Sequence, residues 1–103
     1  MNQQIFKEIQ TLKRQILPNE KVILFGSQAR GNALEDSDWD VLVLLNKEKI
    51  TYNDENAFAY PFAEIGWNYG TYISVKVYTE KEWLSRSFTP FYHNIRKEGI
   101  VIY

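Results

Sequence analysis

The stretch LFGSQARG at residues 24–31 is followed, ten residues beyond Ser27, by DWD at residues 38–40 and the apolar run VLVLL at residues 41–45. An apolar strand that reaches Gly26 can turn sharply there, because glycine has no Cβ and lets its backbone approach a ligand closely. Ser27 then opens a short helix, and the free N–H groups of a helix N-terminus favour a bound phosphate. The stretch therefore predicts a phosphate-binding turn between two apolar strands.

Asp38 and Asp40 stand two residues apart at the head of the second apolar run. Side chains alternate along a strand, so both carboxylates are expected on one face, where oxygen ligands can hold Mg²⁺. A carboxylate within a buried strand, as at Asp40, is costly unless a cation or hydrogen-bond donors meet it. Together with Gly26, Ser27 and the guanidinium of Arg30 as phosphate donors, the pair predicts a site for a nucleotide and a metal ion.

Each motif also has a plain structural interpretation. Gly26 and Ser27 could form an ordinary strand-to-helix turn in which Ser27 is the N-cap. Residues 36–38 could form an Asx-type turn before the strand. The combination of the two motifs favours the nucleotide site, and Glu35 and Asp36 are interpreted as solvated loop residues.

Composition narrows the class of protein. The 103 residues have a formal net charge of -1, 16% aromatic residues and no cysteine. We expect one domain over residues 1–103, no disulfide or thiolate metal site, and no field that would draw in a nucleic acid. No apolar run approaches the ~20 residues of a membrane span. The first residues do not resemble a signal peptide, so a cytoplasmic location is expected.

Hydrophobic periodicity and turn residues predict helices interleaved with strands, hence an α/β (α+β) domain with a small mixed sheet packed by helices. A helix capped by Asn53 or Asp54 contains Pro61, which is expected to kink it or to mark its true start. The aromatic residues near the C-terminus are expected to form core or lid packing. The predicted elements are helices at 2–17, 27–32, 53–69, 79–86 and 89–99, and strands at 21–25, 38–45, 71–79 and 100–103.

The two motifs at this spacing resemble the signature of the nucleotidyltransferase superfamily that includes DNA polymerase β: an apolar residue, Gly-Ser, a gap of about ten, then Asp-apolar-Asp-apolar. With SQARG at residues 27–31 and SDWD at residues 37–40, the chain is most similar to the small antitoxin-type minimal nucleotidyltransferases. The resemblance is strongest over residues 22–45. It implies the nucleotidyltransferase fold, a nucleoside triphosphate substrate such as ATP, and one or two Mg²⁺ ions held by Asp38 and Asp40.

One element departs from the pattern. Catalytic members of the superfamily place a third carboxylate on the next core strand, but the matching segment YISVKVY at residues 72–78 has neither Asp nor Glu. Ser74 and Lys76 share one face of that strand, and a lysine there would repel a second cation while attracting phosphate. Lys76 is therefore a candidate nucleotide ligand. Glu64 or Glu80 could supply the missing acid instead.

Two functions from different classes remain open. The first is a nucleotidyltransferase that passes a nucleoside monophosphate to a hydroxyl, with Asp38 and Asp40 as catalytic metal ligands and Gly26, Ser27 and Arg30 near the phosphates. The second is a non-catalytic antitoxin or regulatory module whose nucleotide pocket serves recognition. Small relatives of this type commonly pair with helical HEPN-type ribonucleases, so the resemblance implies a protein partner, on which the acceptor hydroxyl could lie.

Overall fold

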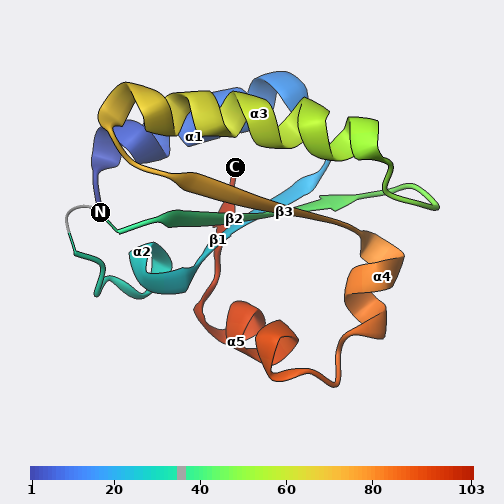
Figure 1. Ribbon diagram of the computed structural model, residues 1–103. Coiled ribbons are helices and arrows are strands. Elements are labelled where there is room, and N and C mark those ends of the chain that lie inside the picture. The colour runs from blue at the N-terminus through green and yellow to red at the C-terminus, as the bar shows by residue number, and fades with distance from the viewer. Residues whose placement is uncertain (35–36) are drawn as a thin grey trace.

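A mixed sheet covered by helices on both faces forms the molecule, seen here in a computed structural model (Figure 1). The structure describes residues 1–34 and 37–103, so Glu35 and Asp36 lie outside the described residues. The predicted mixed α/β class is confirmed. The helices are α1 (Gln3–Ile16), α2 (Gly26–Arg30), α3 (Tyr52–Tyr69), α4 (Glu80–Ser85) and α5 (Pro90–Glu98), and the strands are β1 (Lys21–Phe25), β2 (Trp39–Leu45), β3 (Ile73–Thr79) and β4 (Ile100–Ile102).

The strand order across the sheet is β3-β2-β1-β4. Strand β2 runs parallel to β3, reached through the long helix α3, and antiparallel to β1, which also pairs antiparallel with β4. The register sets Phe25 opposite Asp40 on one side of β2, and Ser74 opposite Asp40 on the other. The candidate site residues therefore come together at one end of the two central strands.

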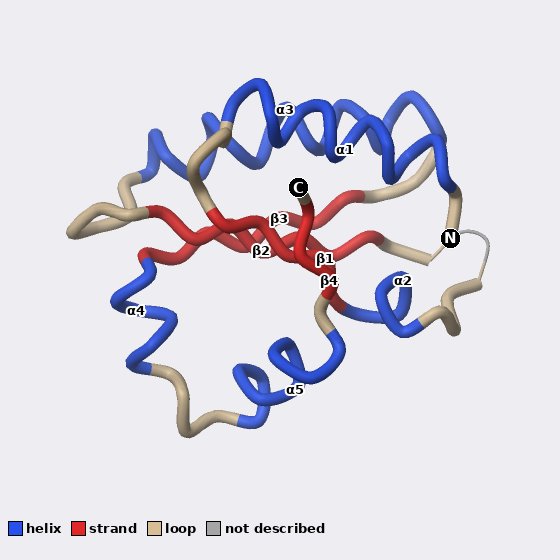
Figure 2. Tube along the Cα trace, turned by 180° about the vertical axis from the view of Figure 1, so that it is seen from behind, coloured by secondary structure: helices blue, strands red, loops and turns tan. Residues whose placement is uncertain are grey.

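Helices α1 and α3 cover one face of the sheet, and α2, α4 and α5 lie on the other (Figure 2). Alternate residues of β2 supply the two cores: Trp39, Val41, Val43 and Leu45 pack toward α1 and α3, whereas Leu42 and Leu44 pack toward Trp83 and Tyr92. Strand β2 is therefore covered on both faces. Asp40 lies on the same face as Leu42 by this alternation.

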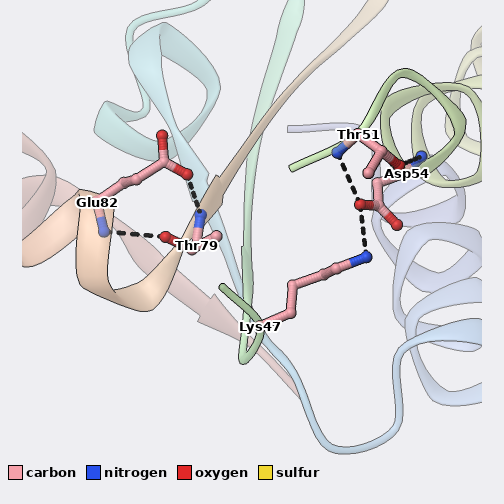
Figure 3. Close-up of polar contacts among 5 residues, drawn as sticks. All are labelled: Lys47, Thr51, Asp54, Thr79 and Glu82. Carbon is pink, nitrogen blue, oxygen red and sulfur yellow. Dashed lines mark hydrogen bonds and ion pairs between the residues drawn. The ribbon is translucent and has the colours of Figure 1, made fainter. Parts of the chain in front are cut away.

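Two capping boxes start the helices that follow β2 and β3 (Figure 3). The hydroxyl of Thr79 accepts a hydrogen bond from the backbone N–H of Glu82, whose carboxylate accepts one from the backbone N–H of Thr79. Thr51 and Asp54 form the same pair at the start of α3. The prediction that Asn53 or Asp54 caps this helix is wrong, because Asp54 is the third residue of the box rather than its cap.

Pro61 lies inside α3, which begins nine residues before it, so the proposal that Pro61 marks the true start of the helix is also wrong. Its neighbour Phe62 is fully buried in the core between α3 and the sheet. Tertiary packing of this kind compensates for the hydrogen bond that a proline removes. Within residues 1–34 and 37–103, no helix combines the length and apolar character needed to cross a bilayer.

Candidate active site

Gly26 brings the backbone of the first motif directly against the second. Its φ of +76° is in the left-handed region, and a Cβ placed there would collide with the carboxylate of Asp40. Helix α2 begins at Gly26 with Phe25 as its N-cap, and no side chain caps it. The interpretation of Ser27 as an N-cap is therefore wrong. Its hydroxyl lies in the first turn, beside backbone N–H groups that have no acceptor within the helix.

Asp40 is half-buried near the head of β2, and its environment is unfavourable for a negative charge. Burial raises its pKa, and the negative charge of Asp38 raises it further. The positive charges of Lys76 and Arg30 act in the opposite direction without cancelling the shift. Asp38 thus lies near enough to Asp40 to repel it, which is the arrangement expected of two carboxylates that share a cation.

Asp38 is exposed, but the residues on both sides of it are fixed. The carbonyl of Ser37 accepts hydrogen bonds from the side-chain amide of Gln28 at 3.1 Å and from the hydroxyl of Thr71 at 3.4 Å. Trp39 is 2% exposed, and its N–H donates to the carbonyl of Tyr72 at 2.9 Å. The carboxylate of Asp38 is therefore held at the site by anchored neighbours, although it projects into solvent.

Gln28 is a positioning residue that the sequence analysis overlooked. It is 4% exposed and connects α2 of the first motif to the segment that carries the second. The only sequence signal is a polar residue between Ser27 and Ala29, in a helix too short to show a period. Its long-range partner could not be foreseen.

Arg30 lies in the last turn of α2 and points to a partner on α5. Its guanidinium forms an ion pair with Glu98 at 3.5 Å, and both side chains are partly exposed. Its charge reaches Asp40, since it contributes to lowering the pKa of that carboxyl. Arg30 thus lies at the edge of the site, paired with Glu98.

The register of β3 resolves which residue stands beside Asp40. Ser74 is level with Asp40, and Lys76 is level with Leu42, one pleat further from the motif. Both belong to the face that carries Asp40. Among the described residues, no group of three or more His, Cys, Asp or Glu side chains is arranged to hold a metal ion.

Neither Glu64 nor Glu80 supplies a third carboxylate, so that suggestion is wrong. Glu64 is exposed on α3, which covers the opposite face of the sheet. Glu80 begins α4 at the other end of β3, beside Leu44 and Lys21 in a cavity of about 490 Å³. Glu35 and Asp36 lie outside the described residues.

The donor set fits one hard divalent cation. Asp38 and Asp40 offer carboxylate oxygens, the ligands that Mg²⁺ prefers, and the electrostatic penalty on Asp40 is one that a cation would relieve. Because Gly26 has no side chain, the carboxylate of Asp40 can pack directly against the start of α2. The first turn of α2 thus lies beside the carboxylate of Asp40, on the face of the sheet that α2, α4 and α5 cover.

Comparison with known proteins agrees with this geometry. A family model described as a nucleotidyltransferase domain matches residues 3–102. A protein of Methanocaldococcus jannaschii, provisionally named a protein adenylyltransferase, is 31% identical over 87 residues, which cover 82% of this chain and 78% of that protein.

Solved structures show the same fold. A provisionally named nucleotidyltransferase from Sulfolobus solfataricus superposes with a TM-score of 0.61 at 25% identity, over 95% of this chain and 76% of that one. A chain of a toxin-antitoxin structure with AMP-PNP gives a TM-score of 0.63 at 18% identity, over 100% of this chain and 73% of its own. A chain of the toxin-antitoxin MntA-HpeT mutant Y104A gives 0.60 at 19% identity, over 100% and 72%. By its sequence match over nearly the whole chain, the protein belongs to the nucleotidyltransferase domain family.

Proposed function

We propose that the protein binds a nucleoside triphosphate with Mg²⁺ and transfers a nucleoside monophosphate to a hydroxyl group, most simply one on a partner protein. The observation that carries the proposal is the contact between the two motifs. A Cβ at Gly26 would collide with the carboxylate of Asp40, so the first turn of α2, which contains Ser27, lies against that carboxylate. Membership of the nucleotidyltransferase family supports the reaction class.

In the proposed reaction the acceptor oxygen attacks the α-phosphorus of the nucleotide. The bond from that phosphorus to the oxygen bridging the β-phosphate breaks, pyrophosphate leaves, and the proton of the hydroxyl passes to water. Backbone N–H groups of Gly26 and Ser27, together with the Ser27 hydroxyl, would bind the terminal phosphates, and Lys76 would add positive charge from β3. Asp38 and Asp40 would hold Mg²⁺, which when bound neutralises charge that develops on the phosphate oxygens.

A second candidate function follows from strand β3. A nucleotide pocket without a third acid on that strand also suits a non-catalytic antitoxin or regulatory module that binds a HEPN-type helical protein. The relatives of known structure include chains of toxin-antitoxin assemblies, which supports a protein partner in either case. The two functions are distinguished by whether pyrophosphate is released.

Thermal unfolding with nucleotides tests the binding step. Wild-type protein is melted with ATP, GTP, CTP or UTP, each with Mg²⁺ and with EDTA. A ligand at about one hundred times its dissociation constant adds ~2.7 kcal/mol of stability, which raises the Tm of a domain of this size by roughly ten degrees or more. We expect a Mg²⁺-dependent increase for at least one nucleotide.

Matched variants assign that increase to the site. Asp38→Asn with Asp40→Asn should abolish it, whereas Glu64→Gln on the opposite face should retain it. Pyrophosphate release in the presence of the HEPN-type protein, lost in Asp40→Asn, would establish the transferase, and a nucleotide-dependent shift with no release would favour the binding module. No shift with any nucleotide would refute the proposed nucleotide site.

A further inference from the structure

The face of β3 beside the carboxylate pair carries a hydroxyl and an ammonium group. Ser74 is level with Asp40, and Lys76 follows two residues later on the same face. Residues two apart on a strand are separated by about 6.6 Å, which is close to the reach of a lysine side chain. The ammonium group of Lys76 can therefore extend from its own position toward the space beside Asp40.

Lys76 is available for a ligand. It is exposed, and among the described residues it forms neither a hydrogen bond nor an ion pair. The ion pairs found there join Arg30 to Glu98 and Lys47 to Asp54. Its influence on the Asp40 carboxylate is nevertheless one of the charge effects felt at the site. Lys76 is thus an exposed cation on the face of β3 that adjoins Asp40, near enough for its charge to act on that carboxylate.

The supply of carboxylate ligands, rather than the total charge, limits how many metal ions this part of the chain can hold. Asp38 and Asp40 are two carboxylates, which suffice for one divalent cation bound together with a triphosphate. A second divalent cation would gain no further carboxylate among the described residues, and it would approach the ammonium group of Lys76. Two positive charges at close range repel, and a serine hydroxyl is a weak substitute for a carboxylate as a metal ligand.

We infer that the site holds a single divalent cation between Asp38 and Asp40, and that Lys76 supplies the second positive charge for the triphosphate. This inference rests on the proposed nucleotide site and states which groups supply positive charge there: one metal ion and one lysine. A lysine binds phosphate as a point charge and needs no coordination geometry. Ser74, level with Asp40, occupies the position from which a carboxylate could recruit another ion.

Counting bound Mn²⁺ by electron paramagnetic resonance tests the inference without measuring turnover. Protein is titrated with Mn²⁺ in the presence of an α,β-methylene analogue of the responding nucleotide, which cannot release pyrophosphate. We expect one bound ion per chain, lost in Asp40→Ala. Two bound ions in the wild type would overturn the inference while leaving the nucleotide site intact. No bound ion would instead refute the nucleotide-metal site itself.

Variants of β3 test the two residues separately. Lys76→Met should weaken binding of the triphosphate analogue by about tenfold, the usual value of one charge-assisted contact, with the Mn²⁺ count unchanged. Lys81→Met, on α4 beyond the far end of β3, is the matched control and should bind as the wild type does. Unchanged affinity in Lys76→Met would overturn the role of that lysine.

The double variant Ser74→Asp/Lys76→Met restores an acid and removes the repelling charge. It should raise the Mn²⁺ count from one to two, whereas Ser74→Asn/Lys76→Met, which has the same bulk without the charge, should stay at one. Circular dichroism spectra of the two double variants confirm that both are folded before ions are counted. A count of one in a folded Ser74→Asp variant would overturn the assignment of Ser74 to the second ion's position.

Discussion

The two faces of the sheet are built differently. The face under α1 and α3 is a closed aliphatic and aromatic core, in which Leu24, Val41 and Phe62 have no exposed surface. The face under α2, α4 and α5 has a smaller apolar cluster, a cavity of about 490 Å³ near Trp83, and the charges of Asp40 and Lys76. The first face therefore contributes most of the stability of the fold, whereas the second contributes less because it holds charged groups and a cavity.

The difference explains why the same strand serves both purposes. Strand β2 alternates between the two faces, so Trp39 and Val41 anchor it in the closed core while Asp40 emerges on the open one. A carboxylate needs a rigid support to hold a fixed position, and a buried neighbour on either side provides it. Changes on the closed face should therefore lower stability, and changes on the open face should alter binding.

The largest effect is expected from Phe62→Ala on the closed face. Phe62 is 0% exposed, and a large-to-small change of this kind costs about 3–5 kcal/mol, or roughly 15 degrees in Tm for a chain of this size. Phe88→Ala is the control, because Phe88 is 81% exposed and its removal should change stability by less than about 0.5 kcal/mol. Urea unfolding measures both. Similar losses in the two variants would contradict the division between the faces.

The next largest effect is expected from two glycine variants, which distinguish the cost of a left-handed backbone from the cost of a collision in the site. Gly26 and Gly31 have φ values of +76° and +79°, but only at Gly26 would a Cβ meet another group, the carboxylate of Asp40. Gly31→Ala should cost about 1–2 kcal/mol for its left-handed backbone alone, and Gly26→Ala roughly 1 kcal/mol more. Adding Asp40→Ala should bring the two glycine variants to the same loss. A persisting difference in the free energy of unfolding would show that the collision is not with Asp40.

Much of this fold was accessible from the sequence. Hydrophobic periodicity and turn residues located the elements, and the apolar run at residues 41–45 identified a buried strand that contains the carboxylate of Asp40. The start of α3 was missed because Thr51 pairs with an Asp at the third position rather than the commoner Glu or Gln. Pro61 was misjudged because packing around Phe62 outweighs local propensity.

The site was harder to predict than the fold. The alternation of side chains along the strand put Ser74 and Lys76 on one face. Which of them lies level with Asp40 depends on the register of β3 against β2, which pairs residues more than thirty positions apart. The contact of Gln28 with Ser37 and the ion pair of Arg30 with Glu98 are also set by tertiary structure alone. Local sequence patterns indicate candidate residues for a site, whereas strand register and tertiary contacts decide where each side chain lies within it.

Asp40→Asn is expected to have a smaller effect on stability and, unlike the preceding variants, to raise it. Burial and the charge of Asp38 raise the Asp40 pKa, so its ionised form destabilises the folded protein at neutral pH. In EDTA the variant should melt a few degrees higher than the wild type, and the gain should shrink as the pH falls through the raised pKa and the wild-type carboxyl becomes protonated. With Mg²⁺ and nucleotide the order should reverse, because only the wild type gains the ligand. A lower Tm in EDTA would contradict an electrostatic penalty at the site.

The smallest effect on stability is expected at the N-terminal cap of α3, one of the two helices that cover the closed face. The ammonium group of Lys47 donates to Asp54 at 2.7 Å, and with the N–H of Thr51 it lowers the Asp54 pKa (Figure 3). A carboxyl group whose pKa is lower in the folded than in the unfolded protein stabilises the fold at a pH above its unfolded pKa, near 3.9. That contribution is lost as the pH falls through the lower pKa of the folded state. Asp54→Asn keeps an oxygen acceptor for the cap, so the wild type should melt a degree or two higher at pH 7 and lose this advantage below about pH 4. Because the pair is partly exposed, 0.5 M salt should also reduce the difference in Tm at pH 7. A difference in Tm that neither salt nor pH affects would show that the cap, and not the charge of Asp54, accounts for it.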